Sequence, residues 1–369
     1  MLLSLLRNVA SRGRVPADPQ QAESPFFDHL MSRFFAKLGE PLRDNFDCER
    51  YSVPPGSIVS FNPDYAHHGF RLIHDHAREI EQVLNLFEDE TSRVLYEDLL
   101  LYRMLGHTYM RLPANNPQHW AMREAARQMR SGDSSCTGAF GPLERFRLEF
   151  EGESLDVQCY AGNVAWSFLM RQYYFDRDGI RIQASTGDYV IDAGACYGDT
   201  ALGFAAATGT NGRVFAFDIM PLHMQVSQTN LASDPALAPR IELVEAALAD
   251  RDDVPLYIHG RGPGARVSAT PSQEQVRVST IDKYVAEHGI PRIDFIKMDI
   301  EGAEGAALAG AVKTMRRWRA RLAISLNHQP TDIFRVPLYL DSLGLGYKFY
   351  LDHYTIHHEE TVLYAVPRS

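Results

Sequence analysis

The stretch YVIDAGACYGDTALGFAAATG, residues 189–209, decides the fold class of this chain. It begins as a short apolar strand that ends in Asp192, turns through Gly194 and Gly198, and continues as a helix. A ligand that lies against the backbone at the carboxyl end of such a strand needs glycines there, because a Cβ would block its approach. The first amides of the helix then face the ligand. We therefore expect a cofactor-binding turn, although many strand–helix junctions need a glycine for structural reasons alone.

A second strand, RVFAFD, ends in Asp218, twenty residues after Gly198. An acid at this place can accept hydrogen bonds from both ribose hydroxyls of an adenosine. A third strand begins at Ile241 and ends near Ala246 and Ala247, whose small side chains would let an adenine ring lie flat. A strand end packed under a helix would need the same small residues, so this interpretation stays open.

A fourth strand, IDFIKMD, ends in Asp299, and a fifth, LAISL, ends shortly before His328. Open α/β sheets bind their ligands at the carboxyl ends of the strands, so Lys297 and Asp299 are expected to reach the crevice. Glu301 and Glu304 follow at the start of a helix, where acidic side chains also stabilise the helix dipole.

Strands that alternate with helical segments predict a doubly wound, mostly parallel α/β fold. The later segments GYKFYLDHYT and TVLYAV are expected to form a sixth strand and an antiparallel seventh, for a sheet of seven strands. Amphipathic patterns over residues 22–39 and 73–106 predict a mainly helical N-terminal region. Alternating residues 144–160 predict a β-hairpin that joins the two parts. We therefore expect a helical region over residues 1–140 and a Rossmann-like domain over residues 141–369.

Composition narrows the classes of partner. The net charge of −10 gives no global basic field for nucleic acid. The four cysteines form no CxxC pair, which favours a reducing, cytoplasmic setting over a zinc site or a disulfide scaffold. The opening MLLSLLRNVASRGR is too short to span a bilayer, so we expect no stable membrane insertion and, at most, weak surface contact. A homo-oligomer remains open.

The second part resembles the FkbM family of methyltransferases, Rossmann-like class I enzymes that use S-adenosylmethionine. The resemblance rests on VIDAGACYGDTAL, VFAFDIMP, EAALAD, VSTIDKY and IDFIKMDIEGAEGAALAGA, in order between residues 187 and 366. It departs from the family at two positions, where Cys196 stands in place of the commoner asparagine and Asp218 in place of glutamate.

The resemblance also implies roles for individual residues. It implies that the loop around the methionine moiety is formed by Asp192, Gly194, Ala195 and Gly198, and that the helix beneath this loop begins at Asp199 and Thr200. It implies that Asp218 is the acid that binds the ribose and that Ile219 is an apolar neighbour of the adenine. Ala246 and Ala247 would lie at the edge of the adenine, and Asp299 would lie near the transferring methyl.

The reaction implied by the resemblance is O-methylation of a hydroxyl on a saccharide or secondary metabolite, a small-molecule acceptor. Because the sulfonium already activates the methyl, the enzyme has to align the acceptor oxygen and assist removal of its proton. His328 is the first candidate for the base, and a loop-orienting role is the alternative. Lys297 and Asp299 would hold the substrate hydroxyl. They could instead hold Mg²⁺, an alternative that stays open but is not favoured, so no metal ligands are assigned.

Two other functions stay open. An NAD-dependent oxidoreductase also needs a glycine turn and an acid about twenty residues further on, but the GxGxxG spacing is absent from the turn after Asp192. A non-catalytic protein that binds the cofactor without turning it over would share the fold.

Overall fold

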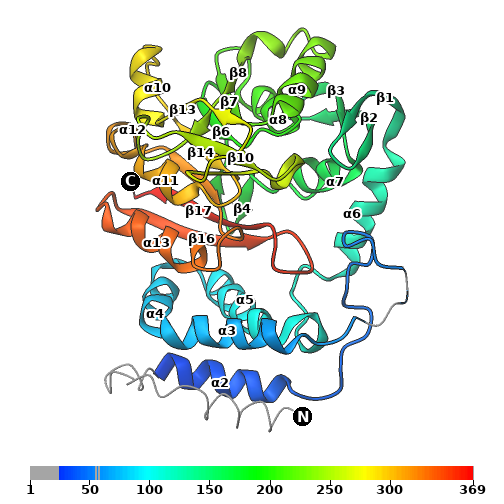
Figure 1. The fold of residues 1–369 in the computed structure, drawn as a ribbon, viewed down its shortest axis with the longest axis vertical. Coiled ribbons are helices and arrows are strands. Elements are labelled where there is room, and N and C mark those ends of the chain that lie inside the picture. The colour runs from blue at the N-terminus through cyan, green and yellow to red at the C-terminus, as the bar shows by residue number, and fades with distance from the viewer. Residues whose placement is uncertain (1–24, 55, 57–58, 369) are drawn as a thin grey trace.

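The computed structural model describes residues 25–54, 56 and 59–368. The N-terminal stretch considered for membrane-surface contact lies outside these residues. Figure 1 shows two parts, a group of helices formed by the first third of the chain and a sheet flanked by helices formed by the rest. In the described part of the chain, no helix combines the length and the apolarity needed to cross a membrane.

The central sheet has seven strands in the order β16-β17-β15-β14-β6-β7-β8. In chain order they are β6 (Tyr189–Ala193), β7 (Arg213–Asp218), β8 (Ile241–Glu245), β14 (Phe295–Met298), β15 (Arg321–Ser325), β16 (Tyr347–His353) and β17 (Thr361–Pro367). β17 is antiparallel to both of its neighbours, and the other neighbouring pairs are parallel. The α/β class and a mixed sheet with an antiparallel last strand are confirmed.

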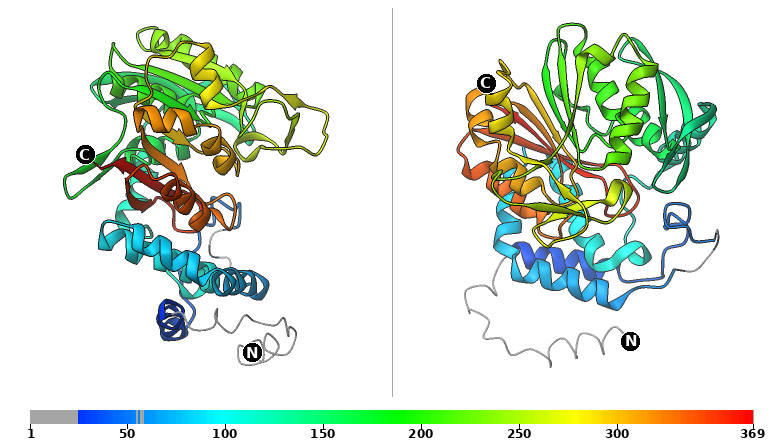
Figure 2. Two further views of the ribbon diagram at one scale, coloured as in Figure 1. Left: turned by 90° about the vertical axis from the view of Figure 1, so that its left-hand side faces the viewer. Right: turned by 45° about the horizontal axis from the view of Figure 1, so that its top comes forward.

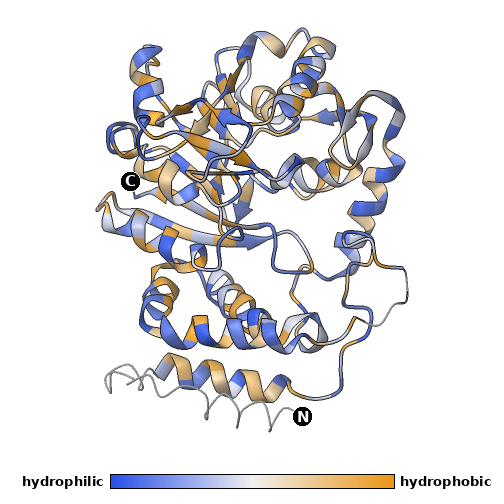
Figure 3. Ribbon diagram, viewed as in Figure 1, coloured by the Kyte–Doolittle hydropathy of each residue, from blue (hydrophilic) through white to orange (hydrophobic). Residues whose placement is uncertain are grey.

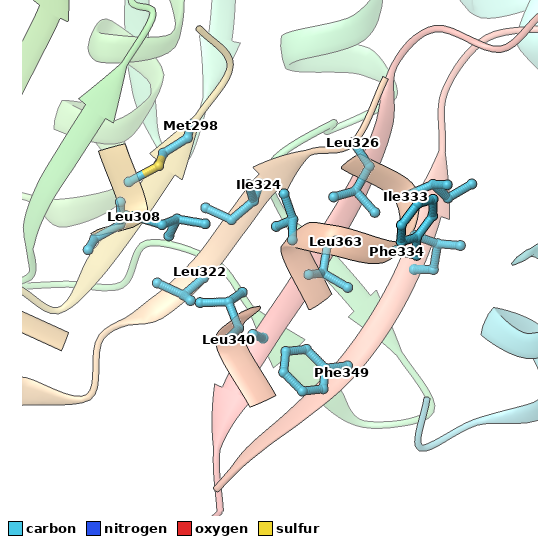
Figure 4. Close-up of a cluster of buried hydrophobic side chains, with 14 of the residues drawn as sticks. Met298, Leu308, Leu322, Ile324, Leu326, Ile333, Phe334, Leu340, Phe349 and Leu363 are labelled. Carbon is cyan, nitrogen blue, oxygen red and sulfur yellow. The ribbon is translucent and has the colours of Figure 1, made fainter. Parts of the chain in front are cut away.

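Both faces of this sheet are buried, which explains why its inner strands are mostly apolar. Neighbouring residues such as Val190 and Ile191 belong to different core clusters, because successive side chains of a strand point to opposite faces. One face packs against α8 (Asp199–Thr208) and α9 (Pro221–Ser233). The other packs against α10 (Ile281–Glu287), α11 (Glu304–Ala309), α12 (Val312–Trp318) and α13 (Asp332–Ser342). Figure 4 shows part of this second core, where Leu308 and Leu340 lie beside Leu322 and Leu363.

The N-terminal helices are α2 (Pro25–Lys37), α3 (Pro63–Asp75), α4 (Ala77–Leu86), α5 (Glu90–Tyr109) and α6 (Pro117–Gln128). Of these, α5 packs against the edge of the sheet at β16, whereas α6 packs against the segment that follows β3. The Glu88 amide donates to the Phe349 carbonyl, and Phe87 forms a bridge to the same residue. This contact closes an edge strand that would otherwise present free backbone groups. Figure 2 shows the helices stacked below the sheet, and Figure 3 shows that they carry both polar and apolar residues.

The two helices predicted from about Ile73 to Gly106 are present as α4 and α5, and a further helix, α3, precedes them and was not predicted. α3 begins at Pro63, where the Asn62 side chain accepts from the amides of Asp64 and Tyr65. Proline is favoured at the first position of a helix, so this proline begins a helix instead of breaking one. The chain then breaks at His76 and continues as α4.

The predicted hairpin is present and is larger than expected. β2 (Gly141–Phe150) and β3 (Glu153–Cys159) pair as an antiparallel hairpin, and β1 (Arg130–Gly138) adds a third strand. A short turn of α7 (Ala161–Asn163), a π-helix over Val164–Leu169, and the hairpin of β4 (Phe175–Arg177) and β5 (Ile180–Ile182) lead to the central sheet.

A small antiparallel sheet between β8 and β14 was not predicted. It consists of β10 (Leu256–His259), β11 (Arg266–Ser268) and β12 (Gln275–Val276), and we call residues 256–276 the flap. It is flanked by β9 (Ala247–Leu248) and β13 (Val278–Ser279), which pair in parallel. The flap packs on a small core of its own that includes Ile258 and Val276.

Candidate active site

A cleft of about 490 Å³ lies at the carboxyl ends of β6, β7, β8 and β14. Six of the residues predicted to bind a cofactor line it: Gly194, Asp218, Ile219, Ala246, Ala247 and Asp299. The flap contributes Pro263 and Val267 to the opposite wall.

The glycine turn is shaped by a close approach of two strands. Gly194 has a φ of +84°, and a Cβ at this position would lie 1.8 Å from the Asp299 carbonyl oxygen. No other residue fits there without moving the end of β14. Gly198 also has a positive φ, +80°, directly before α8. The turn therefore requires glycine at both predicted positions.

Asp218 is the centre of a polar network on one side of the cleft. Its Oδ2 accepts from the Cys196 amide at 2.9 Å, and its Oδ1 accepts from the Met220 amide at 2.9 Å. The Nδ1 atom of His223 lies 3.0 Å from the same Oδ1. These contacts hold the acid at the end of β7 and connect it to the glycine turn.

Other predicted residues lie beneath the turn and do not line the cleft. Asp192 is fully buried, and its Oδ2 accepts from the Thr200 hydroxyl at 2.7 Å. Ala195 is 2% exposed and packs in the core under the loop. Asp199 accepts from the Ser167 hydroxyl at 3.2 Å, and burial raises its pKa to about 6. We therefore infer that these residues shape the loop from below.

Lys297 also lies beneath the turn. Its Nζ atom is 3.1 Å from Asp192 Oδ1 and donates to the carbonyls of Ala193 at 3.1 Å and Gly194 at 2.6 Å. Burial alone would lower the pKa of Lys297, but Asp192 and Asp299 raise it. Because these three contacts occupy an ammonium that is 1% exposed, the predicted contact with a substrate hydroxyl does not fit the structure. Lys297 positions the turn.

Asp299 stands at the end of β14 with both oxygens engaged. Its Oδ2 accepts from the Tyr173 hydroxyl at 2.7 Å, and its Oδ1 lies 3.2 Å from His328 Nε2. His328 Nδ1 lies 2.7 Å from Glu304 Oε1, and the Glu304 carboxylate also accepts from the amides of Ile300 and Gly302. One histidine thus joins two carboxylates at the ligand edge of the sheet.

This arrangement favours a charged histidine. Burial alone would lower the pKa of His328, but the hydrogen bonds to Asp299 and Glu304 raise it well above its usual value. Burial alone would raise the pKa of Asp299, but the hydrogen bond to His328 and its charge hold it well below the usual range. The predicted role of His328 as general base therefore does not fit, because an imidazolium between two carboxylates cannot take a proton at neutral pH.

Asp299, Glu304 and His328 place one ligand atom each within 4.8 Å of one another, a spacing that would also suit a metal ion. Both nitrogens of His328 face a carboxylate, and Glu304 already accepts two backbone amides. A proton on the imidazole satisfies this group, so we assign it no metal.

Residues 192–349 match the model of the methyltransferase FkbM domain. This part of the chain therefore carries an FkbM methyltransferase domain. The match spans the glycine turn, Asp218, the end of β14 and His328. No curated protein matches the chain in sequence.

One solved structure agrees with this chain at the level of the fold. The methyltransferase FkbM from Methylobacillus flagellatus matches with 18% identity and a TM-score of 0.53, over 90% of this chain and 70% of that chain. Two other structures match with lower scores. Aeropyrum pernix fibrillarin with bound S-adenosyl-L-methionine matches with 14% identity over 64% of this chain and 97% of that chain, at a TM-score of 0.33. The Bacillus cereus O-methyltransferase with SAH matches with 12% identity over 69% of this chain and 92% of that chain, at a TM-score of 0.34.

The cleft of the FkbM domain suits the parts of S-adenosylmethionine. Ile219, Ala246 and Pro263 offer apolar walls for an adenine ring, and Asp218 offers acceptor oxygens for ribose hydroxyls. The wall formed by Asp299 and its neighbours is acidic, as a sulfonium cation requires.

Two groups in or beside this site were not predicted. His223 lines the cleft, and its buried Nε2 atom has no hydrogen-bond partner among the described residues. Tyr173 holds Asp299 from a loop far from it in sequence. Glu301, for which the sequence left a place at the strand end and a role at the helix start both open, lines the cleft. His223 could have been found from its place in the first turn after Asp218, but no local signal indicates Tyr173.

Proposed function

We propose that this protein is an O-methyltransferase that transfers the methyl of S-adenosylmethionine to a hydroxyl of a saccharide or secondary metabolite. One observation supports this most directly: the cleft at the strand ends joins a ribose-type acid, Asp218, to an acidic group around Asp299 in an FkbM domain. The first suits the nucleoside end of the cofactor and the second suits its sulfonium end.

In this proposal the cofactor lies along the cleft from the flap to the end of β14. The glycine turn would follow the methionine moiety, and Asp192, Ala195, Gly198, Asp199 and Thr200 would support that turn from below. Asp218 would accept from the ribose. Ile219, Ala246 and Ala247 would contact the adenine. When bound, S-adenosylmethionine supplies an activated methyl group.

The protein's own contribution is positioning and proton transfer. Asp299, fixed by Tyr173 and His328, would orient the acceptor hydroxyl toward the methyl with a carboxylate that stays ionised. His328 would hold two carboxylates in place, and Lys297 would hold the turn. Mg²⁺ is not needed in this scheme, because no step relies on a Lewis acid.

The proposal includes the organisation of the chain. We infer a helical region over residues 1–140 and a doubly wound, Rossmann-like domain over residues 141–369. The first strand, β1, begins at Arg130 and pairs with β2. The four free thiols, Cys48, Cys136, Cys159 and Cys196, fit a cytoplasmic setting. The acceptor would be a small molecule and not nucleic acid, since the net charge is −10.

The experiment uses S-adenosylmethionine with a ¹³C-labelled methyl and a panel of saccharides, phenols and amines. NMR of the products distinguishes O-methyl from N-methyl carbons. Transfer to a hydroxyl, lost with Asp299→Ala and kept with the exposed Asp178→Ala, supports the proposal. Transfer only to an amine contradicts it. Cofactor binding without transfer to any hydroxyl would favour a non-catalytic binding protein.

A further inference from the structure

Glu301 is a carboxylate on the wall of the cleft, three residues beyond the end of β14. It has a positive φ of 55°, a conformation that few residues other than glycine adopt, and its side chain is 33% exposed. The next acid along the chain, Glu304, is fully buried and does not line the cleft. Glu301 is therefore the accessible acid beside Asp299.

The carboxylate of Glu301 is also free of hydrogen bonds. Among the residues that the structure describes, none donates to it, and its nearest charged neighbour is His328, with Nε2 3.6 Å from Oε1. In contrast, both oxygens of Asp299 are engaged, one by Tyr173 and one by His328. A group that has to receive a proton needs a free oxygen, and Glu301 has one.

The surroundings of Glu301 bring the pKa of its carboxyl group close to neutral pH. Burial raises the pKa of Glu301 most, the charge of His328 lowers it, and the carboxylates of Asp299, Glu304 and Glu360 raise it, with a result of about 7. A general base works best when its pKa lies near the working pH, because it is then both ionised and basic.

We propose that Glu301 is the general base that takes the proton of the acceptor hydroxyl. This inference rests on the proposed O-methyltransferase function. The hydroxyl oxygen forms a bond to the methyl carbon, the carbon–sulfur bond breaks with its electron pair left on sulfur, and the hydroxyl proton moves to the Glu301 carboxylate. Glu301 later gives that proton to water.

The acids and bases around Glu301 do not fit this role. His328 carries its proton between two carboxylates, and Asp299 is held ionised by His328 and Tyr173. An acid with so low a proton affinity removes a hydroxyl proton poorly. These two residues position the hydroxyl, and Glu301 accepts its proton.

The test compares the binding of two ligands, and neither measurement needs an acceptor substrate. S-adenosylmethionine carries a fixed positive charge on sulfur, whereas S-adenosylhomocysteine does not. If Glu301 faces the methyl position, the sulfonium favours the ionised carboxylate, so binding of S-adenosylmethionine at pH 7 releases up to about half a proton. Calorimetry in buffers of different ionisation enthalpy counts that proton.

The variants are Glu301→Gln, which keeps the shape of the side chain, and Glu149→Gln, an exposed acid on β2, as the matched control. We expect the wild type and the control to release more protons with S-adenosylmethionine than with S-adenosylhomocysteine, and the Glu301→Gln protein to show no difference while both ligands still bind. Equal release in wild type and Glu301→Gln would overturn the inference alone. Failure of the wild type to bind either ligand would overturn the proposed function as well.

A kinetic measurement on an acceptor from the panel gives a second readout. The rate should rise with pH through about 7 and level off above it, because the base acts when ionised. Glu301→Gln should lower kcat by about 10²–10⁴-fold and remove this rise. An unchanged pH profile in the variant would contradict the assignment of the base.

Discussion

Lys297 Nζ lies 3.1 Å from Asp192 Oδ1, in a pair of residues that face each other across the parallel strands β14 and β6. Both side chains are almost fully buried, at 1% and 0% exposure. The same ammonium binds the carbonyls of Ala193 and Gly194, where the chain enters the glycine turn. The pair therefore connects the core of the sheet to the loop that follows the cofactor.

Removal of the charge from Lys297 should destabilise the fold. In Lys297→Met, Asp192 stays buried without its cationic partner, and such losses cost about 3–5 kcal/mol in free energy of unfolding. Urea denaturation measures the loss. The control, Lys283→Met, removes an exposed lysine whose ion pair is screened by solvent, so it should have a much smaller effect. An equal effect of the two substitutions would contradict the role of the buried pair.

The stability contributed by His328 should depend on pH in a defined direction. Since its pKa is raised in the fold, its contribution is complete below the unfolded value of 6.5 and is lost as pH rises through the folded value. The pKa of Asp299 is lowered in the fold, so its effect on stability has the opposite sign. The contribution of Asp299 to stability is present above its unfolded pKa of 3.8 and is lost as pH falls through its lower pKa in the folded state.

The difference in unfolding free energy between wild type and His328→Asn should therefore be largest between pH 3.8 and 6.5. It should decrease toward acid as Asp299 takes a proton and toward alkaline pH as His328 loses one. Denaturation curves at a series of pH values test this. A difference that does not vary with pH would mean that the histidine contributes by packing alone.

Gly194→Ala should disrupt the turn. The new Cβ would lie 1.8 Å from the Asp299 carbonyl oxygen at a φ of +84°, so the end of β14 has to move. We expect a loss of several kcal/mol in stability, or a loss of cofactor binding in a protein that still folds. Gly305→Ala is the control, because a Cβ there meets nothing within 4 Å, and its helical position should gain from alanine. Tolerance of both substitutions would contradict this account of the turn.

The sequence predicts the fold best where a local pattern has one structural meaning. Apolar strands that alternate with helical segments, and the glycines after Asp192, predict the α/β sheet and its antiparallel last strand. The helix α3 is missed because Pro63 follows a stretch rich in turn residues, and proline both begins and breaks helices. The flap is missed because β12 is only two residues long and carries no periodic pattern.

Some residues of the site can be predicted from the sequence and others cannot. Asp218 and Asp299 can be predicted because each follows the end of a strand, and the topology brings these strand ends together. The roles of Lys297 and His328 depend on which partners fold against them, and only the tertiary structure shows that carboxylates and carbonyls already occupy both. Tyr173 reaches Asp299 across 126 positions of sequence, a distance over which no motif extends.

The most direct test of the central claim is isothermal titration of the purified protein with S-adenosylhomocysteine, with NAD as the competing ligand. We predict saturable binding of S-adenosylhomocysteine and none of NAD. Asp218→Ala should weaken binding by about 10- to 100-fold, since a hydrogen bond to a charged group contributes about 1.5–3 kcal/mol. The exposed control Asp253→Ala should bind like the wild type. Absence of binding, or preference for NAD, would contradict the claim that this cleft is a methyltransferase site.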